Sequence, residues 1–392
     1  MSLAPSLPPS PDPRSVRRRL ATRLGPLPGP ARRLLGSSLV EGLATPHSVS
    51  RYLEALHPLW TIEGGRAVVT QVRPETSDTV TLTLRPDHVW QGVTAGQHVR
   101  LGVLIDGAVR TRTYSVSSSQ HRADGAFTVT VKRKEGGFVS AHLTSAVEVG
   151  EVLHIGPARG EVVLPDPRPE RLLLISGGSG ITPLAAMLRT LADEDHPGSV
   201  TFLHYARTAD DVPFARELQA IADRLPGVEL VVVPTAGGAH GTASDHTGRC
   251  TPEQLAAIAP DHLEVPTFAC GPSGLIDLLE AHYEQAGAAD RLQVERFTPP
   301  ALRTSDGPGG GTLRFAASDL TVDDDGGSLL EQAEAAGLTP QHGCRMGICH
   351  TCTLRKPAGA VLDLRSGRRS DAPDEEIQIC VTVAAGDVVL DL

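Results

Sequence analysis

The stretch Cys344-Arg-Met-Gly-Ile-Cys349-His-Thr-Cys352 holds three of the chain's six cysteines, and Cys380 follows it after 27 intervening residues. The spacing is therefore C-x4-C-x2-C, followed by one distant cysteine. Four thiolates in this uneven order form the plant-type ligand set of a [2Fe–2S] cluster, in which a single loop supplies three ligands. The spacing predicts that one such cluster is bound by Cys344, Cys349, Cys352 and Cys380.

Two other interpretations of these cysteines are weaker. A structural zinc site usually takes its ligands from two short pairs, whereas this chain offers one triple and one single cysteine. A disulfide framework is unusual in a chain of 392 residues that has only six cysteines and no secretory signal. Sparse cysteines, most of them assigned to a cluster, instead indicate a reducing cytoplasm as the location.

Length and composition suit a multidomain enzyme. A chain of 392 residues exceeds what one hydrophobic core usually serves, so two or three domains are expected. A hydrophobic content of 40% and a charged content of 21% are ordinary for a soluble protein. No apolar run approaches the roughly 18–20 residues that span a bilayer. The net charge is −10, and positive charge is concentrated only in the N-terminal tail, which argues against nucleic-acid binding.

Residues 1–60 differ from the rest of the chain. Residues 1–30 are rich in proline and arginine, cannot bury a core and are expected to be disordered. An export signal is rejected, because no apolar segment follows the arginines. Residues 31–60 have an amphipathic pattern, for which a short helix packed on the first domain is favoured. The alternative is a docking surface for an anionic membrane or a membrane-bound partner, which would place the protein peripherally at the inner face of the membrane.

Residues 61–168 predict an antiparallel β-barrel. Short alternating, β-branched segments are separated by Gly, Pro and Asp. The expected strands are Val68–Val72, Thr79–Leu84, His98–Leu101, Arg112–Val116 and Phe127–Val131.

The strand around Arg112 carries residues suited to a flavin. The Arg112 guanidinium can pair with phosphate, the Tyr114 ring can lie on the flavin ring, and the Ser115 hydroxyl can reach the flavin N5 edge. A glycine-containing stretch then leads from Lys132 into a helix start, where free N–H groups favour a pyrophosphate. Its candidate ligands are Lys132, Gly136, Gly137, Val139 and Ser140.

Residues 169–297 alternate strand and helix, which predicts an α/β domain with a parallel sheet. The apolar strand Arg171–Ser176 runs into a glycine loop and then into Pro183, which suits a first helical turn. This order makes a phosphate cradle, although the loop is not the G-x-G-x-x-G fingerprint. The candidate nucleotide-binding residues of this loop are Gly177, Gly178, Gly180 and Thr182.

Two further segments of this domain carry candidates. In the turn Cys270-Gly271-Pro272-Ser273, the cysteine is small and soft enough to lie against a flat ring, although packing at a strand end is the alternative. Phe297 closes the domain and either shields the flavin or packs in the core. Cys250 is interpreted as a core residue. Residues 298–311 have linker composition, and residues 312–392 form a β-rich unit with a helix near Ser328–Ala336.

From about residue 61 onward, the chain resembles the ferredoxin–NADP reductase superfamily with a C-terminal plant-type [2Fe–2S] ferredoxin domain. The motifs that carry the resemblance are Arg112-Thr-Tyr-Ser115, Gly177–Pro183, Cys270–Ser273 and the four cysteines. The order of domains is similar to that of phthalate dioxygenase reductase and of desaturase-partner reductases. The resemblance implies a flavin barrel, an NAD(P)-binding domain and a β-grasp-like ferredoxin domain. It also implies that Ser115 and Cys270 lie at the reacting rings.

The implied activity is an NAD(P)H:acceptor oxidoreductase. NAD(P)H would give a hydride to the flavin, and electrons would pass singly through the cluster to a partner protein. The expected partner protein is a fatty-acid desaturase or an oxygenase, including a haem monooxygenase. The reductase itself is expected to be a monomer. FAD is favoured over FMN. The alternative is a redox-sensing or scaffolding module, against which the complete nicotinamide loop argues.

The choice between NADPH and NADH depends on the end of the strand Val200–Tyr205. A 2′-phosphate requires positive charge there, whereas a bare ribose hydroxyl prefers a carboxylate. Arg207 follows this strand directly, with Asp210 and Asp211 just beyond. Because Arg207 is closer to the strand, NADPH is favoured.

Overall fold

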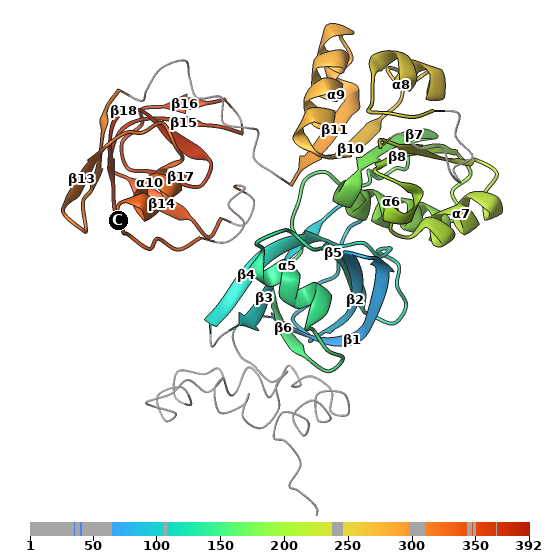
Figure 1. The fold of residues 1–392 in the computed structure, drawn as a ribbon, viewed down its shortest axis with the longest axis horizontal. Coiled ribbons are helices and arrows are strands. Elements are labelled where there is room, and N and C mark those ends of the chain that lie inside the picture. Colours follow the sequence, from blue (N-terminus) through green and yellow to red (C-terminus); the bar gives the residue numbers. More distant parts are fainter. Residues whose placement is uncertain are drawn as a thin grey trace, which may run out of the picture.

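The computed structural model describes residues 65–105, 108–236, 246–297, 310–342, 350–365 and 367–392, together with Leu35, Val40 and Gly347. Its chain forms three bodies, which are coloured blue to green, green to orange and orange to red in Figure 1. The predictions of a disordered tail and an N-terminal helix fall almost wholly outside the described residues. Cys344 and Cys349 also lie outside them.

The first body is a six-stranded antiparallel sheet with the order β4-β3-β6-β1-β2-β5. Alternating apolar side chains from its strands form one core, onto which Val139 and Leu143 of helix α5 (Phe138–Ser145) pack. This confirms the predicted antiparallel flavin-domain fold. Its strands are β1 (Gly65–Thr76), β2 (Thr79–Pro86), β3 (His98–Ile105), β4 (Ala108–Ser115), β5 (Phe127–Lys132) and β6 (Val152–Ile155).

The second body is a five-stranded parallel sheet with the order β11-β10-β7-β8-β9. It is covered on one face by α6 and α7 and on the other by α8 and α9 (Figure 1). Its strands are β7 (Arg171–Gly177), β8 (Ser199–Ala206), β9 (Val228–Pro234), β10 (Thr267–Gly271) and β11 (Leu292–Arg296). Its helices are α6 (Ile181–Asp193), α7 (Ala215–Arg224), α8 (Pro252–Ile258) and α9 (Ser273–Gln285), with short 3-10 turns at Gly178–Gly180, Ala209–Asp211 and Ala289–Arg291.

Burial on both faces explains the continuous apolar sequence of β7. Leu172 and Leu174 face the α6–α7 side, whereas Leu173 and Ile175 face the α8–α9 side. The strand order reverses between β7 and β10, and the helices that follow these two strands, α6 and α9, lie on opposite faces of the sheet, which makes this a topological switch point. This is where an open parallel sheet binds its ligands.

The third body is a mixed five-stranded sheet with the order β13-β12-β18-β15-β16, accompanied by the ribbon β14–β17. Helix α10 (Leu329–Ala335) packs against it and begins at a capping box formed by Ser328 and Glu331. The strands are β12 (Thr312–Phe315), β13 (Leu320–Asp323), β14 (Thr353–Lys356), β15 (Ala358–Asp363), β16 (Arg369–Ser370), β17 (Glu375–Gln378) and β18 (Thr382–Leu390).

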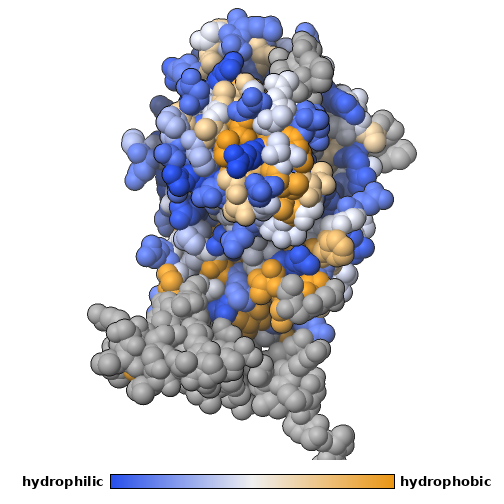
Figure 2. Space-filling view, turned by 90° about the vertical axis from the view of Figure 1, so that its left-hand side faces the viewer, coloured by the Kyte–Doolittle hydropathy of each residue, from blue (hydrophilic) through white to orange (hydrophobic). Residues whose placement is uncertain are grey.

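The face in Figure 2 is mostly hydrophilic, with smaller hydrophobic patches between the charged side chains. Within the described residues, no helix combines the length and the apolar character needed to cross a membrane.

Candidate active site

Strand β4 presents the predicted flavin-binding residues on two faces. Arg112 and Tyr114 share one face, on which Arg112 is exposed and Tyr114 packs against the barrel core. Burial raises the pKa of Tyr114, so its ring is a neutral, largely apolar surface. A guanidinium and an aromatic ring two residues apart fit a phosphate and a flat ring system.

Ser115 points to the opposite face and is buried. Its Oγ has no hydrogen-bond partner among the described residues, and neither does Oγ1 of Thr113. Leaving a buried hydroxyl unsatisfied costs about 1–3 kcal/mol, so a polar edge of a ligand at this position would be stabilising. The orphaned hydroxyl therefore fits the predicted contact with a flavin.

The glycine loop before α5 closes on itself. Gly136 has φ +69°. Gly137 is the N-cap of the helix, and a Cβ there would lie 2.5 Å from Oγ of Ser140. The Ser140 hydroxyl accepts a hydrogen bond from Lys134 N at 3.1 Å, so it shapes the loop. The first-turn N–H groups of α5 remain suited to an anion, and buried Val139 anchors that turn in the core.

Lys132 ends strand β5 beside an acidic partner. Its Nζ lies 3.2 Å from Oδ2 of Asp78, which belongs to the same barrel. Burial alone would raise the pKa of Asp78. The hydrogen bonds that its carboxylate accepts outweigh burial and lower the pKa; the one from Thr79 has the largest effect, followed by those from Thr76 and Lys132. Lys132 stays a candidate phosphate ligand, and Asp78 holds its side chain at the end of the strand.

The two loops predicted to bind the nucleotide touch each other at the switch point. A Cβ on Gly180 would lie 2.1 Å from the carbonyl oxygen of Cys270, and one on Gly177 would lie 2.9 Å from Cδ of Pro272. Gly271 is also close to the first loop, because a Cβ there would lie 3.1 Å from the backbone nitrogen of Gly177. The glycines are thus required for the approach of two loops that are far apart in sequence.

The remaining residues of this loop shape its backbone. Gly178 has φ +54°, in the left-handed region that favours glycine. The buried Thr182 donates from its Oγ1 to the carbonyl oxygen of Ser179 at 3.0 Å. Together they turn the end of β7 into the first turn of α6, which is the predicted phosphate cradle.

Cys270 is completely buried at the end of β10. Burial, and then the nearby Glu295 carboxyl, raise the pKa of its thiol well above the ordinary value. The thiol is therefore neutral at physiological pH and is not an activated nucleophile. A small neutral sulfur suits contact with a ring, as predicted for a residue beside the nicotinamide.

Glu295 is a further candidate site residue, which the sequence analysis does not predict. It pairs with Cys270 in the register of β10 and β11, and its Oε1 lies 3.4 Å from Nδ1 of His98 on the barrel. His98 pairs with Ser115 across β3 and β4. The contact between Glu295 and His98 thus joins the two domains next to the strand positions of Cys270 and Ser115. The sequence feature that could have indicated Glu295 is its position as a carboxylate in the last strand of the domain, two residues before Phe297.

The carboxyl of Glu295 lies in a poorly solvated position. Its side chain is 14% exposed, and Oε2 has no hydrogen-bond partner in the described part of the chain. Burial raises its pKa, and the contact with His98 offsets part of that effect. The group can therefore keep a proton to a higher pH than an ordinary glutamate. Phe297 follows β11 and is half-buried, so it stays a candidate for shielding the flavin.

Replacing Glu295 by glutamine should make thermal stability less sensitive to pH. The folded-state pKa is raised above the unfolded value of about 4.3, so wild-type stability is fully present below that value and declines as pH rises through the folded pKa. The melting temperature of Glu295→Gln relative to wild type should therefore increase between acidic and alkaline pH. A difference that stays constant across this range would contradict the assignment.

Replacing Arg112 by alanine should remove most of the bound flavin and leave the iron content intact. The guanidinium supplies charge-assisted hydrogen bonds, and the cluster belongs to a different body of the protein. Flavin-to-iron ratios of the purified variants measure this effect, and Tyr114→Ala should act in the same direction. Arg110→Ala is the matched control, because Arg110 is an exposed arginine on the same face of β4. Loss of both cofactors from Arg112→Ala would instead indicate a folding defect.

Arg207 follows β8, as predicted, and is 67% exposed. Its Nη2 lies 3.1 Å from Oδ1 of Asp211, whose Oδ2 accepts a hydrogen bond from Thr208 Oγ1 at 3.0 Å. An exposed ion pair contributes only about 0–1 kcal/mol, so a 2′-phosphate could replace Asp211 at little cost. The geometry therefore leaves Arg207 available to a phosphate.

The ribbon β14–β17 brings together two of the cysteines that are predicted to bind the cluster. Cys352 precedes β14 and Cys380 follows β17, and the carbonyl oxygen of Cys352 accepts a hydrogen bond from Ile379 N at 3.3 Å. Both cysteines are buried in the core of the third body. The register Thr353↔Gln378 places the ends of the ribbon side by side, which fits two thiolates of one cluster.

Gly347, the described residue between Cys344 and Cys349, packs beside this pair. It has φ +72°, and a Cβ there would lie 2.7 Å from Cγ2 of Val381, the residue after Cys380. Arg365 donates from Nη1 to the carbonyl oxygen of Gly347 at 2.7 Å. Only glycine fits this position, as expected for a loop that is bent tightly around a ligand.

The barrel also touches the cysteine loop. Arg100 on β3 donates from Nη1 to Oγ1 of Thr351 at 3.0 Å, and Thr351 lies directly before Cys352. Arg100 pairs with Thr113, which is flanked by Arg112 and Tyr114. The candidate flavin strand and the candidate cluster loop therefore meet across one side chain.

Comparison with known proteins agrees with this organisation. Models of an oxidoreductase FAD-binding domain, an oxidoreductase NAD-binding domain and a 2Fe-2S iron-sulfur cluster binding domain match residues 66–163, 174–280 and 316–385. An NADPH oxidoreductase of Mycobacterium tuberculosis is 39% identical over 89% of this chain and 90% of its own length. The reductase component of a glycine betaine monooxygenase of Pseudomonas aeruginosa is 32% identical over 76% of this chain and 86% of its own length.

Among solved structures, phthalate dioxygenase reductase has the same fold, with a TM-score of 0.55 and 21% identity over 83% of this chain and 97% of its own. The comparisons confirm the predicted family, the three-domain fold and the cofactors. The chain therefore belongs to the ferredoxin reductase-type oxidoreductases, which transfer electrons from NAD(P)H through FAD and a 2Fe–2S cluster.

Proposed function

We propose that this chain is the NADPH-dependent reductase component of an oxygenase or fatty-acid desaturase system. It delivers electrons to a separate acceptor protein. The observation that carries the proposal is the position of strand β3. Its residue His98 contacts the nucleotide domain at Glu295, and its residue Arg100 contacts the cysteine loop at Thr351. One strand thus links the candidate hydride site to the candidate cluster.

In this proposal, the residues of the site position the groups for hydride transfer and for electron transfer. FAD held by Arg112, Tyr114 and Ser115 would supply hydride acceptance and the release of single electrons to the cluster. Gly177 and Gly180 allow the nucleotide loop to approach Cys270, and Ser115 offers a polar contact at the reacting edge. Arg100 holds Thr351, the residue directly before Cys352, against the barrel.

The names of relatives support an oxygenase-type acceptor. Besides the glycine betaine monooxygenase reductase, they include the reductase component of a stachydrine N-demethylase and one component of a 1,2-phenylacetyl-CoA epoxidase. In each case the name describes one part of a larger system. We infer that this chain also works with a partner. Contact with a membrane through the basic residues 1–60 remains a prediction about residues that the structure does not describe.

Turnover assays distinguish this function from redox sensing. The purified chain should oxidise NADPH continuously when cytochrome c is the one-electron acceptor, and it should support a purified candidate oxygenase or desaturase. Reduction of the bound groups without continued turnover would favour the sensor. Turnover with cytochrome c but with neither class of partner would overturn the proposed acceptor and leave the reductase activity intact.

Replacing Arg207 by alanine should lower catalytic efficiency with NADPH and leave NADH nearly unaffected. The guanidinium would bind the 2′-phosphate, and one charge-assisted interaction contributes about 1.5–3 kcal/mol, or roughly 10- to 150-fold. Steady-state kinetics with both nucleotides measure this effect. Arg216→Ala is the control, because Arg216 is an exposed arginine on the nearby helix α7. A preference for NADH that survives Arg207→Ala would contradict the assignment.

A further inference from the structure

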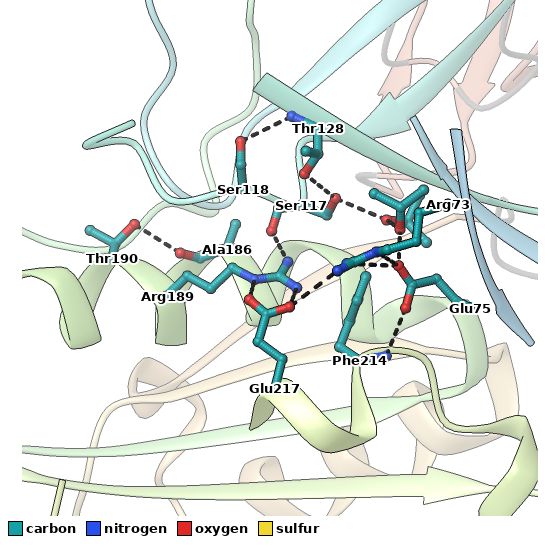
Figure 3. Close-up of polar contacts among 12 residues, drawn as sticks. Arg73, Glu75, Ser117, Ser118, Thr128, Ala186, Arg189, Thr190, Phe214 and Glu217 are labelled. Carbon is teal, nitrogen blue, oxygen red and sulfur yellow. Dashed lines mark hydrogen bonds and ion pairs between the residues drawn. The ribbon is translucent and has the colours of Figure 1, made fainter. Parts of the chain in front are cut away.

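The barrel and the nucleotide domain are joined by a second set of contacts, remote in sequence from the cofactor motifs. Its centre is Arg189 on α6, whose side chain is only 11% exposed (Figure 3). The guanidinium binds Glu217 of α7 in a bidentate manner, with Nε–Oε1 at 2.7 Å and Nη2–Oε2 at 2.8 Å. Two parallel hydrogen bonds fix both the position and the plane of the guanidinium.

The same guanidinium reaches across the domain boundary. Its Nη1 donates to the carbonyl oxygen of Ser117, in the segment that directly follows β4. Its carbon Cζ lies 4.2 Å from the centre of the Phe214 ring, which is a cation–π contact. The planar guanidinium of Arg189 therefore contacts Glu217 of α7, the Phe214 ring and the barrel at the same time (Figure 3).

Phe214 adopts a strained backbone conformation in this contact. It has φ +62°, which is uncommon for a residue with a bulky side chain. Its N–H donates to Oε2 of Glu75 on the barrel at 3.3 Å, and Glu75 is itself held by Arg73 at 2.8 Å. Strained residues persist where the surrounding contacts over-determine them, and they cluster at functional sites.

Helix α6 connects this set of contacts to the nucleotide loop. Its first residues follow Gly180, which touches Cys270. Its later part carries Arg189 and Thr190, and Oγ1 of Thr190 accepts a hydrogen bond from Gln120 N at 3.2 Å. An α-helix rises about 1.5 Å per residue, and a helix as short as α6 moves as a rigid rod. Fixing one end of α6 therefore also positions the other end. The barrel segment that α6 contacts directly follows Tyr114 and Ser115.

We propose that Arg189, held in place by Glu217, is a positioning residue for hydride transfer. It fixes α6 against the segment that follows the flavin strand. It thereby sets the distance between the nicotinamide loop and the flavin face. Arg189 itself contacts neither the nicotinamide nor the flavin. The proposal rests on the NAD(P)H oxidation that characterises the family and is independent of which protein accepts the electrons.

Replacing Arg189 by methionine should separate binding from chemistry. Misplacement of reacting groups by about 1 Å can lower a rate by roughly 10²-fold, so we expect flavin reduction at saturating NADPH to slow by roughly 10- to 100-fold. The dissociation constant of the nucleotide and the contents of flavin and iron should stay near wild type. Stopped-flow absorbance measures the rate and also the charge-transfer band formed with NADP⁺, which should weaken.

Hydrogen exchange provides a readout that does not depend on activity. The Phe214 amide and the amides of residues 117–121 should lose protection in Arg189→Met, because their contacts with Arg189 or its neighbours are lost. Arg224→Met is the matched control. Arg224 lies on α7 and binds Asp195 at 2.8 Å and the carbonyl oxygen of Ala192, so its contacts stay within the nucleotide domain. This control should keep both the wild-type rate and the wild-type exchange.

Two results would overturn the proposal. One is faster exchange at Phe214 together with an unchanged rate of flavin reduction, which would make the contacts purely structural. The other is an equal slowing in Arg224→Met. If Arg189→Met fails to retain flavin, Arg189→Lys decides, because lysine keeps the charge beside Glu217 but loses the planar fork. An intermediate rate with unchanged nucleotide affinity supports the proposal, and a wild-type rate contradicts it.

Discussion

Replacing Cys380 by serine is expected to abolish the cluster and to reduce cytochrome c reduction to background, while NADPH still reduces the flavin. Serine is a poor substitute for a thiolate, and loss of one of four ligands opens the coordination of the cluster. Cys380 is buried in the core of the ferredoxin body, next to the Ile379–Cys352 hydrogen bond. No described side chain there offers a replacement thiolate. Electron transfer should therefore stop after the flavin.

Iron content, visible absorbance and cytochrome c reduction measure this effect in the purified variant. Cys250→Ser is the matched control, because Cys250 is also buried but lies in the nucleotide domain. This control should keep its iron and its activity. Cys344→Ser, Cys349→Ser and Cys352→Ser should behave like Cys380→Ser. Full iron in Cys380→Ser together with loss of iron from Cys250→Ser would show that the ligand assignment is wrong.

Replacing Gly180 by alanine should slow flavin reduction by NADPH by roughly 10²-fold. An added Cβ would lie 2.1 Å from the carbonyl oxygen of Cys270, much closer than real Cβ contacts, so one of the two loops must move. Both loops consist of backbone at this point, and no flexible side chain can turn aside. The change therefore displaces the nucleotide loop from Cys270, on the face where the nicotinamide is expected.

Single-turnover reduction of the flavin, together with flavin and iron contents, tests this prediction. Gly274→Ala is the matched control, because Gly274 lies in the first turn of α9, and a Cβ there meets nothing within 4 Å. It should leave the rate unchanged. A wild-type rate in Gly180→Ala would mean that the contact between the two loops does not position the nucleotide.

The fold and the cofactors could be predicted because their signals are local. Cysteine spacing within one loop, glycines between a strand and a helix, and alternating apolar residues each reflect a constraint that acts over a few residues. Burial of β7 on both faces follows from its uninterrupted apolar sequence. The predicted family, fold class and cofactors are accordingly confirmed, whereas the roles of individual site residues stay predictions.

Contacts between distant segments could not be predicted in the same way. Glu295 reaches His98 only because β11 and β3 belong to domains that pack together, and nothing in either segment indicates its partner. The same holds for Arg189 and Ser117. The sequence also assigned Ser140 to phosphate binding alone, whereas its hydroxyl accepts a hydrogen bond from Lys134. Such pairings depend on tertiary packing, which a single sequence does not display.

The barrel and the nucleotide domain share several buried or charged contacts, including Arg189 with Ser117 and His121 with Glu194 at 2.6 Å. The contact described between the barrel and the ferredoxin body is the hydrogen bond from the exposed Arg100 to Thr351. In calorimetric terms, we therefore expect the first two bodies to melt as one cooperative unit and the third, which has its own core, to melt as another. Losing the cluster should lower the transition of the ferredoxin unit and leave the other endotherm in place.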